Sequence, residues 1–205
     1  MIKLKWVFCI PFLYTQTYFG LVNTESLRSQ HLNPGLHQTL ELYSSNLQGN
    51  SDYLSIETAY RCDWVSTRFP GFLLLNYSTA ESNKENIQNN GFAQIRIGIP
   101  LQNPLKIELF LQKEFNDFTN LEDRNLIGTS LRWILQGNEY EKENQVILNI
   151  GIMVENETIE NEGSSTILRS TNYLILRRIL SSRIQCGTIT YVQPSLEDIK
   201  DLRLL

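Results

Sequence analysis

The sequence is short of the side chains on which most catalytic and metal sites depend. Its 205 residues include only two histidines, His31 and His37, and three cysteines, Cys9, Cys62 and Cys186. Two histidines in one polar segment are too few for a zinc site or for a histidine-dependent triad. No G-x-S-x-G, H-E-x-x-H, C-x-x-C or phosphate-binding glycine loop occurs. We therefore expect no catalytic, metal-binding or cofactor-binding residues, and a protein that is not an enzyme.

The sequence also lacks an excess of positive charge and any long apolar run. The net charge is −4 and no basic stripe is visible, which argues against a nucleic-acid partner. A mean hydropathy of −0.24 leaves no room for several membrane-spanning helices, since each needs about 20 mostly apolar residues. It does not exclude a membrane β-barrel, whose strands are only half apolar.

At the N-terminus, Lys3 and Lys5 precede a short apolar run over residues 6–14 that contains Pro11 and is followed by polar residues. This layout is typical of a secretory signal peptide, predicted here over residues 1–22 without a defined cleavage site. The alternative is a buried first strand or helix. Cys9 would leave with the signal. Cys62 and Cys186 could then form a disulfide or pack as small apolar side chains, and their apolar neighbours favour packing.

Beyond residue 35, apolar and polar residues alternate in one segment after another. In residues 146–154 all five alternate positions are apolar: Val146, Leu148, Ile150, Ile152 and Val154. The pattern recurs over residues 53–64, 92–99, 105–112 and 127–135, and more weakly over 38–47, 70–77, 167–180 and 183–193. Such alternation predicts half-buried strands, nine in all, in an antiparallel sheet. Residues 48–51 and 101–104 predict tight turns, and the polar segments 78–91 and 155–165 predict longer surface loops.

Alternation permits two kinds of barrel. A soluble barrel turns its apolar face inward, whereas an outer-membrane barrel turns it toward lipid and its polar face toward the lumen. Long strands, a preceding export signal and aromatic residues near strand ends (Tyr60, Trp64 and Trp133) favour the membrane form. The polar face then carries four charges at mid-strand as lumen-facing candidates: Arg61, Arg96, Glu108 and Arg132. We expect them to pair across a packed interior, the alternative being that they select ions in a pore.

Residues 110–132 (FLQKEFNDFTNLEDRNLIGTSLR) carry an aromatic and glutamine strand, an Asn-x-Phe loop, an arginine and a G-x-x-L-R strand. This segment resembles the central signature of an uncharacterised outer-membrane family, a domain of unknown function that includes a putative salt-induced outer membrane protein. Collinear pieces at residues 23–28, 49–52, 169–174, 191–194 and 201–203 extend the resemblance. It implies an antiparallel β-barrel of the bacterial outer membrane, without known catalytic or cofactor residues.

The family continues with further strands after its Asp-x-Arg segment and ends on an aromatic residue, whereas this sequence stops at Leu205. Single-chain bacterial barrels use an even number of strands, and we count nine. We therefore expect a C-terminally shortened member of the family with an incomplete or open up-and-down β-barrel, or one that closes as a smaller barrel.

The sequence thus predicts a signal peptide (1–22), a periplasmic N-terminal segment (23–35) and a β-barrel domain (36–205). The expected function is that of a non-enzymatic protein of the bacterial outer membrane with a structural or small-solute, porin-like role. Its expected partner is the lipid bilayer of that membrane. The alternative is an exported soluble β-barrel that binds a small apolar ligand or a protein partner.

Overall fold

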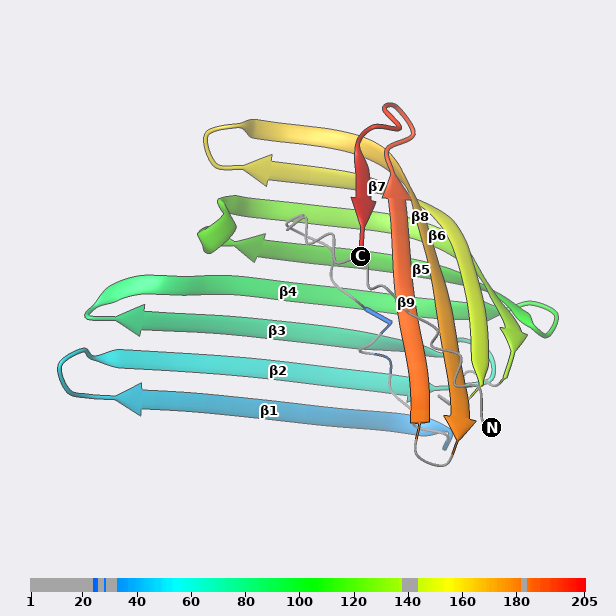
Figure 1. The fold of residues 1–205 in the computed structure, drawn as a ribbon, viewed down its shortest axis with the longest axis horizontal. Helices are drawn as coiled ribbons and strands as arrows, with labels where there is room; N and C mark the ends of the chain where they lie inside the picture. Colours follow the sequence, from blue (N-terminus) through cyan, green and yellow to red (C-terminus); the bar gives the residue numbers. More distant parts are fainter. Residues whose placement is uncertain (1–23, 26–27, 29–32, 138–143, 182–183) are drawn as a thin grey trace, which may run out of the picture.

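The structure is a computed structural model that describes residues 24–25, 28, 33–137, 144–181 and 184–205. The predicted signal peptide, residues 1–22, lies outside the described residues. The described strands form one sheet in which each strand pairs with the next in chain order, always antiparallel (Figure 1). The strands are β1 (Gly35–Leu47), β2 (Tyr53–Val65), β3 (Gly71–Ser82), β4 (Glu85–Pro100), β5 (Leu105–Asn116), β6 (Leu121–Gln136), β7 (Gln145–Ile159), β8 (Gly163–Ser181), β9 (Ile184–Pro194) and β10 (Leu202–Leu204), with a short 3-10 helix η1 (Asp117–Thr119) between β5 and β6.

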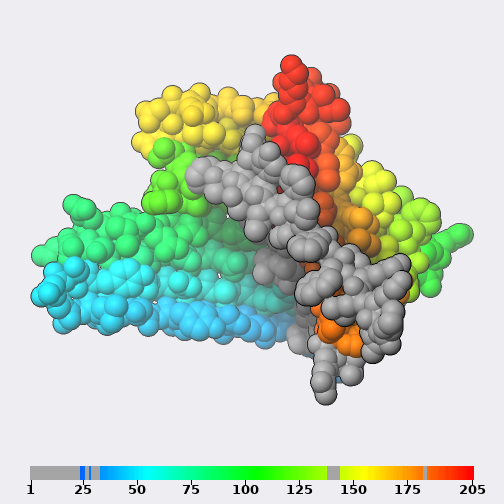
Figure 2. All heavy atoms as spheres, in the orientation of Figure 1, coloured from blue at the N-terminus to red at the C-terminus, as the bar shows by residue number. Residues whose placement is uncertain are grey.

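The predicted fold class is confirmed: an all-β, antiparallel, up-and-down sheet that does not close. β1 to β9 lie where the nine alternating segments predict strands, and the short β10 is additional. β8 and β9 curve away from the direction of β1 to β4, which gives the sheet the form of an open barrel (Figure 1). In the space-filling view, β1 to β4 form a continuous flank and the residues after β9 protrude above it (Figure 2).

The two long loops predicted at residues 78–91 and 155–165 are wrong. β3 and β4 are joined by a two-residue turn at Asn83 and Lys84, whose φ angles of 50° and 69° are those of a tight hairpin. β7 and β8 are likewise joined by a short turn that contains Asn161 and precedes Gly163, both at positive φ. These strands therefore extend into polar sequence. The halves of these strands next to the turns are here called the outer halves. Both faces of the sheet are polar in these halves, so no apolar alternation marks them as strands in the sequence.

The pairing register places the apolar positions of neighbouring strands in rows on one face of the sheet, here called the outer face. One row across β2 to β8 consists of Cys62, Leu73, Ile95, Leu111, Ile127, Val154 and Leu168. Ile127 and Ile150 on this face are 57% and 58% exposed. The opposite, inner face holds most of the buried side chains, so the chain has its polar face inside and its apolar face outside.

A small apolar cluster lies on the inner face of β6 to β9. Ile147, Tyr173, Ile175 and Tyr191 are buried together, and Ile134 and Ile189 pack against them. The two cysteines in the described residues are free: Cys62 is half buried in β2, and Cys186 is exposed on β9. The predicted packing is therefore wrong for Cys186, because the half of β9 that carries it has a neighbour on one edge alone among the described strands.

Close contact between β6 and β7 requires a glycine at position 151. A Cβ added to Gly151 would meet the Cβ of Ser130 and lie 2.5 Å from the Thr129 carbonyl oxygen, whereas one added to Gly187 finds its nearest neighbour at 3.6 Å. We expect Gly151→Ala to lower the free energy of unfolding by about 1–3 kcal/mol. Gly187→Ala, the matched control on the inner face of β9, changes it little. Urea unfolding followed by tryptophan fluorescence measures both, and equal effects would contradict the close contact.

Candidate functional site

The predicted lumen-facing charges lie on the inner face, at the positions that alternate with the apolar rows. Arg96 is on β4, Glu108 on β5 and Arg132 on β6, and all three side chains are buried. Arg132 and Glu108 are each only 1% exposed. Strand pairing places them on adjacent strands, so their side chains converge without a loop to position them.

These three residues meet Glu25 and Arg28 of the N-terminal segment, and the five together are called the Glu25 cluster. The Glu25 carboxylate accepts hydrogen bonds from Arg132 Nη1 at 2.7 Å, Arg28 Nε at 2.8 Å and Arg96 Nη1 at 3.2 Å. Arg28 Nη2 also donates to Glu108 at 2.6 Å, and Arg96 Nη1 donates to it at 3.1 Å. Three arginines and two carboxylates leave the cluster with a net charge of +1 if all are ionised.

Aromatic rings surround the cluster. The guanidinium carbons of Arg96 and Arg132 lie 5.1 Å and 5.6 Å from the ring centres of Phe110 and Tyr173, within the range of a cation–π interaction. The Tyr191 hydroxyl oxygen accepts the backbone N–H of Glu25 at 3.0 Å. The N-terminal segment is therefore tied to the interior at Glu25 through both its side chain and its backbone.

A second group of charges, the Glu155 cluster, lies on the inner face of β5 to β8 and β10. It contains four acids and three arginines: Glu114, Glu155, Glu157, Asp201, Arg124, Arg169 and Arg203. Glu155 accepts from Arg169 Nε and from Arg203 Nη1, each at 2.5 Å. Arg124 Nη1 donates to Glu114 and Arg169 Nη2 donates to Asp201, each at 2.6 Å. With all groups ionised, the net charge is −1, which balances the Glu25 cluster.

Amide and hydroxyl side chains separate the two clusters and line a cavity of about 30 Å³. The polar lining includes Gln94, Gln112, Ser130, Asn149, Thr171 and Gln193. Gln94 Nε2 donates to Gln112 at 3.2 Å. Gln94 Oε1 and Asn149 Oδ1 find no hydrogen-bond partner among the described residues. A space of this size accommodates about one water molecule, so this part of the interior is filled.

The fourth predicted residue, Arg61, lies beside the Glu25 cluster, because the guanidinium carbon of Arg28 is also 5.6 Å from the centre of the Phe72 ring. It pairs with Asp63 on its own strand at 2.5 Å, and its guanidinium carbon lies 5.5 Å from the centre of the Phe72 ring. Sequence reasoning missed Glu25, Arg28 and the whole Glu155 cluster. Arg132 is flanked by Leu131 and Trp133, whereas Arg124 is flanked by Asp123 and Asn125 and Arg169 has Ser170 on one side, so the pattern that identified Arg132 does not single them out. Glu25 carries no such signal, because it precedes the first strand.

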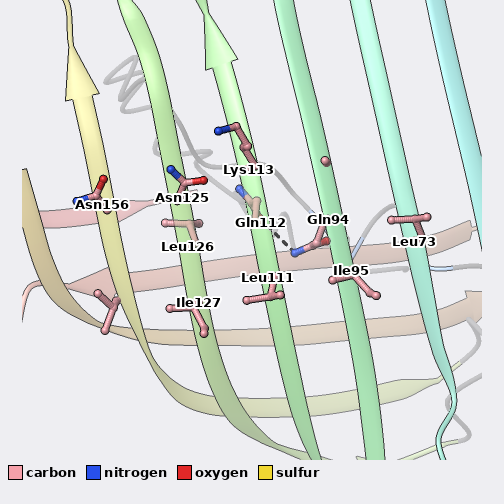
Figure 3. Close-up of a pocket in the computed structure, with 12 residues that line it drawn as sticks. Leu73, Gln94, Ile95, Leu111, Gln112, Lys113, Asn125, Leu126, Ile127 and Asn156 are labelled. Carbon is pink, nitrogen blue, oxygen red and sulfur yellow. Dashed lines mark hydrogen bonds between the residues drawn. The ribbon is translucent and has the colours of Figure 1, made fainter. Parts of the chain in front are cut away.

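The outer face is hollowed by a groove of about 390 Å³ over β3 to β7 (Figure 3). Its apolar lining on this face consists of Leu73, Ala93, Ile95, Leu111, Ile127 and Val154, with Lys113, Asn125 and Asn156 at one end. The groove thus joins an apolar floor to a polar edge. Within the described ranges, no cluster of histidine, cysteine or acidic side chains could hold a metal ion.

Comparison with known proteins gives no relative for this chain: no family model, no curated protein and no solved structure matches it. The resemblance to the outer-membrane family therefore stays a prediction. In the part of the chain that the structure describes, no helix is both long enough and apolar enough to cross a lipid bilayer.

The Glu25 carboxyl group is fully enclosed by the arginines that bind it. Burial acts to raise its pKa, but the charges of Arg132, Arg28 and Arg96 outweigh burial and hold the pKa well below its ordinary value. Glu25 is therefore ionised at neutral pH. Because the pKa is lowered in the folded state, the stability that Glu25 contributes is fully present above the unfolded value of about 4.3 and is lost as the pH falls below it.

Replacing Glu25 by alanine tests whether it neutralises the buried arginines. We expect Glu25→Ala to lower the free energy of unfolding at pH 7 by about 3–5 kcal/mol, since it leaves buried guanidinium groups short of a carboxylate. Glu122→Ala, at an exposed position near the start of β6, is the matched control and should change it by less than about 0.5 kcal/mol. Denaturant unfolding of both variants measures the difference. Equal losses would mean that the N-terminal segment does not stabilise the interior.

Proposed function

We propose that the chain is a non-enzymatic β-barrel protein of the bacterial outer membrane with a structural role. The observation that carries this proposal is the inverted distribution of side chains. Arg132 and Glu108 are buried on the inner face, while Ile127 and Ile150 are more than half exposed on the outer face. In water such a surface would be a large exposed apolar patch, which soluble monomers rarely carry. In a bilayer the same surface is solvated by lipid.

The position of the tryptophans supports the same environment. Trp64 lies near the end of β2 and Trp133 near the end of β6, both on the outer face. β2 and β6 run in the same direction, so both rings lie toward the same end of the sheet. Trp residues near one end of an apolar surface are typical of a membrane–water interface, where an apolar ring with a polar N–H is most stable.

The paired interior supports a structural role rather than a pore. The two charge clusters balance each other, and the cavity between them holds about one water molecule. The predicted export signal and the resemblance of residues 110–132 to an outer-membrane family support the location.

One observation favours the alternative, an exported soluble barrel that binds a small apolar ligand or a partner. The groove on the outer face offers about 390 Å³ and an apolar floor (Figure 3), which is enough for a small hydrophobic molecule. In that alternative, the apolar rows of the outer face that lie beyond the groove are exposed to water. The two proposals therefore differ in what surrounds Ile150, and a charge placed there distinguishes them.

Ile150 is the central residue of the apolar alternation in β7. In the membrane, Ile150→Arg should lower the free energy of unfolding in lipid vesicles by about 2–4 kcal/mol, because the guanidinium group lies at mid-bilayer depth. On a water-exposed surface the same change is within about 0.5 kcal/mol of neutral. Ile199→Arg, at an 80% exposed position between β9 and β10, is the control and should be neutral in both cases. Equal stability of the two variants in vesicles would contradict the proposal, as would purification of the wild-type chain without detergent.

The paired charges on the inner face, with the small cavity between them, predict that the protein does not conduct. Liposomes that contain the purified protein should not swell in an isotonic solution of a small sugar, whereas liposomes with a general porin swell at once. Swelling that depends on the size of the sugar would instead assign a small-solute pore to this chain.

A further inference from the structure

The groove on the outer face lies where the apolar rows of the sheet give way to polar ones. Its apolar floor belongs to the row that contains Leu73, Ile95, Leu111, Ile127 and Val154. The next row toward the turn at Asn83 consists of Ala93, Lys113, Asn125 and Asn156. In Figure 3 the labelled polar side chains of this row lie at one end of the groove, and the apolar ones lie further along it. The groove therefore runs from a polar end into the apolar surface.

A small side chain at position 93 contributes to the hollow. Ala93 lies on β4 between Leu75 on β3 and Lys113 on β5, its partners in the pairing register. Its side chain is a single methyl group, whereas both neighbours carry long side chains. A larger residue at this position would take up space that the groove now offers, so position 93 is where the groove is most directly filled by substitution.

Trp133 and Lys113 lie at opposite borders of the apolar surface of β5 and β6. Trp133 pairs with Leu105, and Leu105 is eight residues before Lys113 on β5, which is about 26 Å along an extended strand. The tilt of barrel strands shortens this to roughly 20 Å of depth, close to the apolar band of outer-membrane barrels, which is about 25 Å tall. At the proposed location, Lys113 therefore lies at the level of lipid headgroups, and the groove extends from there toward the acyl chains.

The charges at the polar end of the groove form a pair of opposite sign. Lys113 Nζ lies 2.8 Å from Asp123 Oδ1, and the two side chains are 62% and 35% exposed. Asn125 Nδ2 donates to the other carboxylate oxygen of Asp123 at 2.5 Å. An ammonium group has three donors and a carboxylate about four acceptor positions, so both retain capacity for a further partner. A headgroup with one phosphate and one ammonium balances both charges, whereas an anionic headgroup sets its phosphate beside Asp123 without an added cation.

We propose that the groove binds one acyl chain of a zwitterionic phospholipid, with the headgroup phosphate on Lys113 and the headgroup ammonium on Asp123. This proposal rests on the proposed membrane location, which places the groove in lipid. The volume of about 390 Å³ is that of a small-molecule site, and its apolar floor with a few polar groups at one end matches an amphipathic ligand. The groove thus holds a specific lipid, while the rest of the outer face is solvated by lipid without selection.

Lipid retention by the full chain, purified in a non-ionic detergent, tests the proposal without a bilayer. The probes are three phospholipids with the same acyl chains. Phosphatidylethanolamine carries a phosphate and an ammonium with N–H donors, phosphatidylcholine has the same charges without an N–H donor, and phosphatidylglycerol is anionic. Native mass spectrometry follows each titration. We expect one phosphatidylethanolamine to be retained about threefold or more tightly than either of the others, because it alone donates a hydrogen bond to Asp123.

Substitutions separate the groove from the headgroup site. Ala93→Phe fills the groove and should weaken the retention of phosphatidylethanolamine about tenfold, since part of the acyl chain loses its apolar contacts. Thr190→Phe, at an exposed position on the outer face of β9 and outside the groove, is the matched control and should leave retention unchanged. Asp123→Asn should remove the preference for phosphatidylethanolamine over phosphatidylcholine, and Lys113→Gln should weaken both. The last two changes are at partly exposed positions, so they test the headgroup contacts even if Ala93→Phe does not fold.

Two results would overturn the proposal. Equal weakening by Ala93→Phe and Thr190→Phe would mean that the acyl chain does not lie in the groove. Equal retention of the three lipids, or tighter retention of phosphatidylglycerol, would mean that Lys113 and Asp123 do not select a zwitterionic headgroup. Either result, combined with a loss of stability of Ile150→Arg in vesicles, would remove the lipid site and leave the membrane location in place. Neutral behaviour of Ile150→Arg would instead contradict the location itself.

Discussion

Every arginine buried on the inner face needs a carboxylate, because a buried guanidinium group without one costs several kcal/mol. This requirement connects strands that are far apart in the sequence. Glu25 links the N-terminal segment to β4 and β6, and Arg203 links β10 to Glu155 on β7. Backbone hydrogen bonds join only neighbouring strands, so these ion pairs are what fix the distance between strands that do not touch. The arrangement of side chains on the inner face depends on these ion pairs.

The same pairs explain why the apolar side chains lie outside. A sheet has two faces, and the inner face, filled by two clusters of opposite net charge, has room for only the small apolar cluster around Ile147 and Ile175. The apolar residues of β4 to β8 therefore form a continuous surface, which includes the groove lined by Leu111 and Ile127. A lipid environment satisfies this surface without a further layer of protein. Water alone does not, and that contrast is the physical basis of the proposed location.

The sequence was sufficient to predict the strands wherever one face is apolar and the other polar, as in β7 from Val146 to Val154. It was insufficient where both faces are polar, and the strand ends near Asn83 and Asn161 were mistaken for loops. Arg96, Glu108 and Arg132 could be assigned to one face because alternation defines direction. Their partner Glu25 could not, since its position depends on how the chain before β1 enters the interior, which no periodic pattern encodes.

The polar outer halves of β3, β4, β7 and β8 lie at the same end of the sheet, because β3 and β7 run in the same direction. Their turns at Asn83 and Asn161 are not constrained by lipid or by the charge clusters. At the proposed location, these hairpin tips extend beyond the bilayer surface. Substitutions in these exposed tips should cost the fold little, whereas breaking one of the buried ion pairs beneath them should cost several kcal/mol.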